Sequence, residues 1–110
     1  MQLSPLDIKA FESYLGISFP YFFLGRYDQA LNWVERALRE KPRLVPALIV
    51  KIAALAMSGS DPDELRDTVQ QVKSLDPGAS IATMMPRLIV SRASDRELFE
   101  TALRRAGLPE

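Results

Sequence analysis

Apolar residues recur along most of the chain at the three- and four-residue spacing of helices, and prolines and glycines separate the segments that carry them. The first such segment contains Ile8, Phe11, Leu15, Phe19, Phe22 and Phe23. Ser4-Pro5 is typical of a helix start, so we expect this helix to run from there toward Leu24. Pro20 lacks an amide donor and crowds the preceding turn, which predicts a kink near residues 17–20 or a split into two helices.

Three more helices are expected in the middle of the chain. An amphipathic pattern predicts a helix over Asp28–Glu40, with Asp28 as its N-cap. The segment Val45–Met57 is apolar at nearly every position, so it predicts a helix that is contacted on most sides and lies in the middle of the domain. A one-sided apolar stripe predicts a fourth helix over Pro62–Leu75, with Ser60 or Asp61 as its N-cap.

The C-terminal third is less regular. Ser80–Met85 predicts a short helix that the following proline limits, whereas the apolar link Leu88–Val90 favours no single conformation. Ser94 and Glu97 have the spacing of a capping box, which predicts the start of a last helix that Gly107 ends. No segment favours strands over helices, so the pattern indicates an all-α chain.

The chain also contains two units of similar pattern. In the first, Gly25 and Tyr27 are followed by small and apolar residues at helical spacing and then by Pro42. The second unit runs in the same way from Gly59 to Pro77, and the step between the two closing prolines is 35 residues. A repeat of this length predicts stacked helical hairpins, each of which buries its apolar face against its neighbour.

The stretch from Leu24-Gly25-Arg26-Tyr27 to Ala37-Leu38-Arg39-Glu40-Lys41-Pro42 resembles the second helix and flanks of a tetratricopeptide repeat. The resemblance implies an all-α, tetratricopeptide-like helical-hairpin solenoid of about five to six helices. It would form a single domain over residues 1–110, with repeat one over about 11–44, repeat two over about 45–79 and a C-terminal capping segment over 80–110.

A wider similarity covers most of the chain. The Ser-Pro-Leu-Asp near the start, the Gly-Arg-Tyr turn and the closing Leu103–Glu110 are similar to the C-terminal repeat regions of bacterial class III adenylate/guanylate cyclases and related regulators, especially those of the rhizobial kind. This similarity implies a regulatory or protein-interaction module, the tail of a larger bacterial signalling protein, that itself contains no cyclase catalytic segment.

The family register places a mostly apolar set of side chains on the inner, concave face. The set comprises Glu12, Leu15, Phe19, Phe22, Phe23 and Arg26 from the first repeat, and Ile49, Ala53, Ala56 and Met57 from the second. Such a face suits a partner helix or an extended peptide. The alternatives are that the segment Ile81–Val90 covers it, or that a second copy of the chain does so in a homodimer. Trp33 is expected to pack between the repeats, with a partner anchor as the alternative.

The composition removes most enzyme chemistry. The chain has no histidine or cysteine, so it lacks imidazole bases, thiols and the usual zinc ligands. Its five glycines are isolated, so the sequence contains neither the G-x-G-x-x-G nor the G-x-x-x-x-G-K-(S/T) pattern of nucleotide-binding loops. The carboxylates of Asp61, Asp63, Glu64 and Asp67 lack the spacing of a calcium loop and are expected to serve a helix N-terminus. We therefore expect no catalytic residue, no cofactor and no metal.

Charge and hydropathy bear on the partner and the compartment. Lys and Arg number 14, as do Asp and Glu, so the formal net charge is zero and a nucleic-acid partner is not expected. The longest apolar stretch is too short to cross a bilayer. The first residues do not show the basic region followed by an apolar region that is typical of a signal peptide. These observations favour a cytoplasmic protein whose partner is another protein or a peptide.

Overall fold

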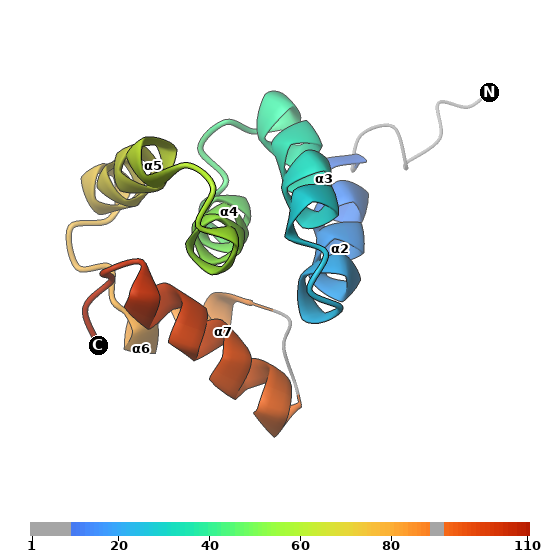
Figure 1. Cartoon of the computed structure of the whole chain (residues 1–110). Helices are drawn as coiled ribbons and strands as arrows, with labels where there is room; N and C mark the ends of the chain where they lie inside the picture. The colour runs from blue at the N-terminus through green and yellow to red at the C-terminus, as the bar shows by residue number, and fades with distance from the viewer. Residues whose placement is uncertain (1–9, 89–91) are drawn as a thin grey trace.

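The structure is a computed structural model that describes residues 10–88 and 92–110, and these residues form helices and turns without any strand (Figure 1). The elements are α2 (Ala10–Phe23), α3 (Tyr27–Glu40), α4 (Val45–Ser58), α5 (Pro62–Leu75), α6 (Ile81–Met84), the 3-10 turn η1 (Met85–Arg87) and α7 (Ala93–Arg105). The predicted all-α class, with about five to six helices, is therefore confirmed.

Two helical hairpins make up most of the molecule. Helices α2 and α3 form the first, α4 and α5 form the second, and α4 lies between α5 and the first hairpin (Figure 1). Gly25 turns the chain within the first hairpin at a φ of 78°, and Gly59 does so in the second at a φ of 65°. Residues other than glycine rarely adopt this left-handed conformation, so these two glycines permit tight connections.

Helix α4 is the centre of the core, as its continuous apolar pattern predicted. Its buried residues are Ala47, Leu48, Ile49, Val50, Ile52, Ala53, Ala54 and Leu55. The alanines among them allow neighbouring helices to approach closely, while the larger side chains fill the space between the helices. Because α4 contacts α3, α5 and α7, it is the element that joins the two hairpins to the C-terminal segment.

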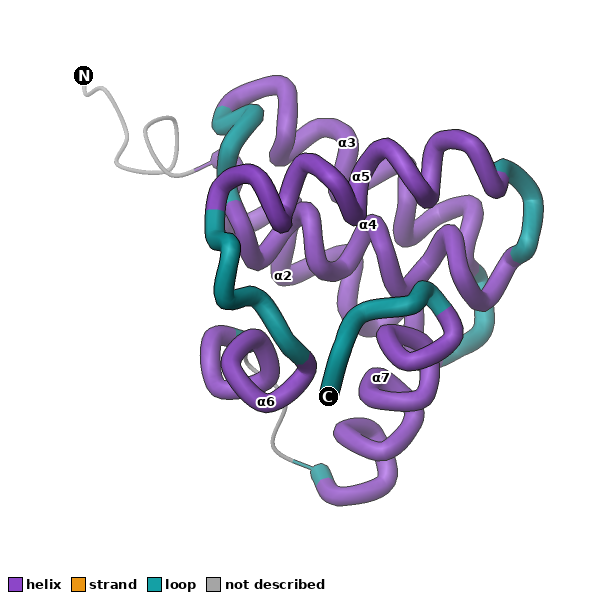
Figure 2. Tube along the Cα trace, turned by 90° about the vertical axis from the view of Figure 1, so that its left-hand side faces the viewer, coloured by secondary structure: helices purple, strands orange, loops and turns teal. Residues whose placement is uncertain are grey.

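The C-terminal segment closes on itself. Helix α7 packs across α4 and buries Phe99, Ala102 and Leu103. Beyond α7 the chain turns back beside α6 (Figure 2), where the amides of Ile81 and Ala82 donate to the carbonyls of Pro109 and Glu110 at 2.7 and 3.1 Å. The tail therefore satisfies amides at the start of α6 that have no partner within that helix.

Three expectations about helix ends need correction. Helix α2 continues through Pro20 as one helix, so of the two alternatives predicted there, a kink or a split, the split does not occur. Helix α3 begins one residue earlier than predicted, which places Asp28 in the first turn instead of at the N-cap. The predicted capping box at Ser94 is wrong, because α7 begins at Ala93 and Ser94 already lies inside the helix. Ser4, Pro5, Ile8 and most of the link Leu88–Val90 lie outside the described residues.

Of the two N-caps that the sequence offered for α5, Ser60 and Asp61, the structure has Asp61. Asp61 is the N-cap residue, and its carboxylate accepts a hydrogen bond from the amide of Glu64 at 3.0 Å. Two of the other carboxylates considered as cation ligands also have protein partners, since Asp63 pairs with Arg66 at 3.3 Å and Glu64 pairs with Lys51. This acidic segment therefore has a structural role at the start of a helix.

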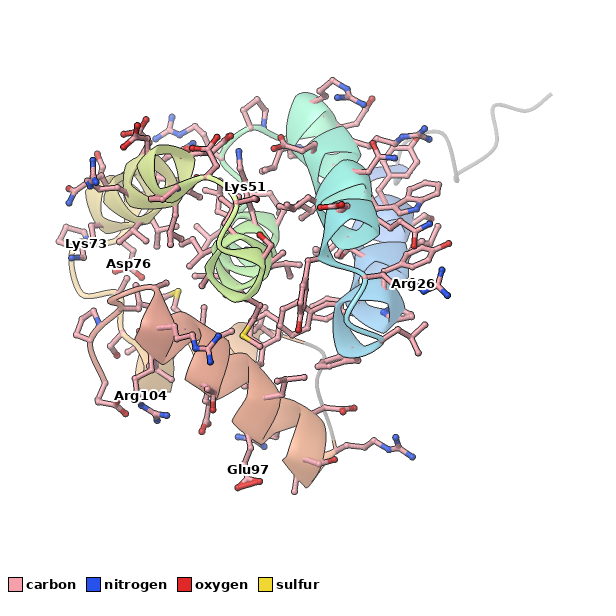
Figure 3. The ribbon with its side chains drawn as sticks, in the orientation of Figure 1. Arg26, Lys51, Lys73, Asp76, Glu97 and Arg104 are labelled. Atoms are coloured by element: carbon pink, nitrogen blue, oxygen red, sulfur yellow. The ribbon has the colours of Figure 1, made fainter. Side chains whose placement is uncertain are left out.

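Lys51 ties the three central helices together. It projects from α4 into the space between α3 and α5 (Figure 3), and its Nζ lies 3.1 Å from Glu35 of α3 and 2.7 Å from Glu64 of α5. The Lys51 side chain is only 12% exposed. Burial alone would lower the pKa of Lys51, but the hydrogen bonds and charges of Glu64 and Glu35 outweigh it and raise that pKa above its ordinary value.

This raised pKa predicts a loss of stability in alkaline solution. A lysine whose pKa is higher in the folded than in the unfolded chain contributes stability below its unfolded pKa, and the contribution is lost as the pH rises through the folded pKa. We expect the free energy of unfolding to fall across that alkaline range, and to fall less in Lys51→Met. Urea titrations of both proteins at several pH values measure the difference. Identical pH dependence in the two proteins would contradict the assignment.

Candidate functional site

An apolar groove of about 640 Å³ lies between α2, the start of α4 and the end of η1. The residues that line it are Phe11, Glu12, Leu15, Gly16, Phe19, Pro20, Leu44, Pro46 and Leu88. Glu12 is the one charged side chain among them, and its position on α2 is exposed to solvent. The volume is within the range of pockets that hold small ligands or a few peptide side chains.

The local sequence explains this lining. Phe11, Leu15 and Phe19 lie four residues apart on α2, so they form one continuous wall of the groove. The opposite side comes from the entry to α4, where Leu44 is the N-cap residue and Pro46 occupies the first turn. Proline suits this position because the first amides of a helix have no intrahelical partner. Apolar carbon therefore dominates the groove.

Gly16 forms a gap in the α2 wall. A Cβ atom built on Gly16 would have no neighbouring atom within 4 Å, so this part of the helix backbone borders open space. Glycine in a helix interior costs roughly 0.5–1 kcal/mol relative to alanine. A Cβ atom at this position would therefore meet no atom of the described structure.

The structure does not keep the predicted inner-face residues together. Glu12, Leu15 and Phe19 all line the groove. Arg26 lies away from them in the turn between α2 and α3, where it points to solvent (Figure 3). Met57 lies at the far end of α4, and its Sδ is 3.8 Å from the guanidinium of Arg105. These residues therefore do not form one continuous binding surface.

Phe22, Ile49 and Ala53 are buried, and the prediction that they line an open face is wrong. Their exposed fractions are 0%, 1% and 0%, respectively. Ala56 and Phe23 are partly buried, and the ring of Phe23 packs against that of Phe22 at a centroid distance of 5.3 Å. These side chains belong to the chain's own core, so a partner cannot reach Phe22, Ile49 or Ala53 in this conformation.

Helix α7 covers this face. The ring centroid of Phe99 lies 5.0 Å from that of Phe22, 6.1 Å from Phe19 and 6.4 Å from Phe23. The alternative offered from the sequence, a cover formed by Ile81–Val90, therefore needs correction, because the ring that packs on Phe19, Phe22 and Phe23 comes from α7. From that shorter segment, Leu88 contributes to the groove wall.

Several lining residues were not predicted. Phe11 was assigned to a buried stripe, and its ring instead forms part of the groove wall with the ammonium of Lys41 at 5.4 Å from its centroid. Leu44, Pro46 and Leu88 reach the groove only through the folding of distant segments. For Gly16, the sequence signal was the presence of a glycine inside a helical pattern, which often has a packing or functional reason.

Trp33 also differs from expectation. Its ring lies 5.8 Å from that of Tyr14, and the guanidinium of Arg36 lies 4.6 Å above its centroid. These contacts are within the first hairpin, so the interpretation of Trp33 as a side chain packed between the repeats is wrong.

Comparison with family models, with curated proteins and with solved structures finds no match to this chain. In the described part of the chain, no group of three acidic side chains is arranged to hold a metal ion. None of the helices there is both long and apolar enough to cross a membrane.

Proposed function

We propose that the chain is a protein-interaction module that binds a short apolar peptide segment of another protein in the groove beside α2, without catalysis of its own. The apolar lining, which carries one carboxylate at Glu12, is the observation that supports this proposal most directly. A peptide buries alternate or helically spaced apolar side chains in such a groove, and the exclusion of their surface from water supplies most of the affinity.

The charge of Glu12 narrows the class of peptide. A carboxylate at the rim of an apolar groove favours a ligand that places a lysine or arginine beside it, and it opposes an acidic ligand. The prolines at positions 20 and 46 offer no backbone donor. We therefore propose an apolar segment with one basic residue at the Glu12 end of the groove as the preferred ligand.

Gly16→Leu tests the proposal by filling the groove. The added side chain would enter open space, and the helix would lose an unfavourable glycine, so we expect stability to be retained while peptide affinity falls at least about tenfold. The probe is the tightest binder from a display library of short peptides, measured by fluorescence anisotropy. Ser13→Leu is the matched control, because it adds the same side chain to α2 at an exposed position that does not line the groove.

Two results would contradict the proposal. The first is that no peptide is enriched from the library by the folded wild-type chain. The second is that the selected peptide binds Gly16→Leu as tightly as it binds Ser13→Leu and the wild type. Glu12→Gln adds a finer test, since it should weaken a peptide with a basic residue more than the same peptide with that residue replaced by alanine.

We further propose that this module is of the tetratricopeptide type and acts in the bacterial cytoplasm as the tail of a larger signalling protein. The support is the resemblance of the Gly25 to Pro42 stretch to that repeat, together with the two antiparallel hairpins. The neighbouring coding sequence is the direct test. A catalytic or receiver segment encoded beside this module would support the regulatory role, and a neighbourhood without signalling proteins would count against it.

A further inference from the structure

Four of the residues that line the groove have the spacing of a helix-packing site. Glu12, Leu15, Gly16 and Phe19 lie at positions i, i+3, i+4 and i+7 of α2, and we call them the α2 hole. When two helices pack, a side chain of one helix, the knob, inserts between four such residues of the other. The α2 hole is open, because Glu12 and Gly16 are exposed and a Cβ atom at Gly16 would meet no atom within 4 Å.

The rest of the groove suits the residues next to a knob. Phe11 lies one turn before Leu15 on α2, and Leu44 and Pro46 form the opposite side of the groove. An amphipathic helix presents apolar side chains one turn apart along a single stripe. Such a stripe can therefore place one side chain in the α2 hole and its neighbours against Phe11 and Leu44.

The groove offers little to the backbone of an extended peptide. None of the residues that line it has a side-chain hydrogen-bond donor, and Glu12 has the one side-chain acceptor. Pro20 and Pro46 also lack a backbone N–H. Carbonyl groups of an extended peptide that press on this lining would lose water without gaining a donor, which costs free energy. A helix satisfies most of these groups within itself, so the lining favours a helical ligand.

The chain already packs a helix of its own against the same part of α2. The ring centroid of Phe99 in α7 lies 6.1 Å from that of Phe19, which also lines the groove. Ala102 and Leu103 follow Phe99 at helical spacing, and all three are buried. Helix α2 therefore accepts an apolar helical stripe next to the groove, and the pattern of α7 is a guide to the pattern of a ligand.

We propose that the ligand of the groove is an amphipathic helix of a partner protein, which inserts a leucine or a similar large apolar side chain into the α2 hole above Gly16. This inference rests on the proposed peptide groove and specifies the conformation of its ligand. Apolar residues one turn from the knob contact Phe11 and Leu44. A lysine or arginine at the rim pairs with the carboxylate of Glu12, so the charges of ligand and groove are complementary.

Proline substitutions in the peptide test whether it binds as a helix. The probe is the tightest library binder of the wild-type chain, and the site chosen is an interior position where alanine leaves its affinity unchanged. Proline at that site should weaken binding at least about tenfold, because it disrupts a helix. Proline at the first residue of the peptide is the matched control and should have little effect, because a helix tolerates proline in its first turn.

A double-mutant cycle tests whether the knob lies above Gly16. Replacing the knob leucine of the peptide by alanine should weaken binding to the wild-type chain at least about tenfold. The same replacement should matter much less for Gly16→Leu, because the new side chain already fills the α2 hole. Ser13→Leu should respond to the peptide change as the wild type does. Circular dichroism and thermal unfolding check that both variants keep their fold.

The outcomes separate this inference from the proposed function. A peptide that loses affinity for Gly16→Leu, yet binds equally well with proline in its interior, would keep the groove and overturn the helical ligand. A bound peptide without the sequential amide–amide contacts of a helix in its NMR spectrum would do the same. If truncation of each apolar residue costs as much with Gly16→Leu as with the wild type, the knob is not above Gly16 and the proposal fails. The absence of any enriched peptide overturns both proposals.

Discussion

Replacing Phe99 by alanine should lower the free energy of unfolding by about 3–5 kcal/mol, the usual cost of removing a buried phenylalanine. The Phe99 side chain is 0% exposed, and its ring contacts three phenylalanines of α2. Its removal would leave a cavity where α7 covers the first hairpin. Urea unfolding followed by circular dichroism measures the effect, and Glu97→Ala, at an exposed position of the same helix, is the control.

The result of this substitution also bears on the inner face. If α7 is held in place mainly by Phe99, the variant should bind the dye ANS more strongly than the wild type, because Phe22 and its neighbours become accessible. A loss of less than about 1 kcal/mol, with no change in dye binding, would show that the aromatic contact contributes little. The cover over the inner face would then depend on the rest of α7.

Leu48→Ala should lower the free energy of unfolding by about 2–5 kcal/mol, because Leu48 is 2% exposed at the centre of the core. Leu24→Ala is a matched control, since it makes the same chemical change at a side chain that is 70% exposed, where a change within about 0.5 kcal/mol is expected. Chemical denaturation of the two variants beside the wild type gives the comparison. Equal effects of the two substitutions would mean that α4 is not the central helix.

Local pattern was sufficient for most helices. The continuous apolar run from Val45 predicted α4 and its central position, and the break before Pro62 predicted the start of α5, with Ser60 or Asp61 as the N-cap. These signals act within one or two turns, so they can be read from neighbouring residues. The first residues of α3 and α7 were predicted incorrectly, because several residues near the start of each helix are compatible with the N-cap position.

The candidate site was only partly predictable, since its geometry depends on contacts between distant segments. The apolar spacing of α2 identified Leu15 and Phe19, but it could not tell which part of that face α7 would cover. Phe22 and Phe19 are three residues apart, yet one is fully buried while the other also borders the groove. The approach of Leu88 and Pro46 to α2 depends on the packing of the whole chain, for which no local pattern exists.

The pairing of the C-terminal tail with α6 has a consequence for the order in which the molecule opens. The amides of Ile81 and Ala82 donate to the carbonyls of Pro109 and Glu110, which follow α7. These amides can exchange with deuterium only when the two hydrogen bonds break. Detachment of α7 should also release the tail that follows it, so we expect these two amides to exchange at least as fast as the amides of α7. We therefore expect that loss of α7 also exposes the start of α6.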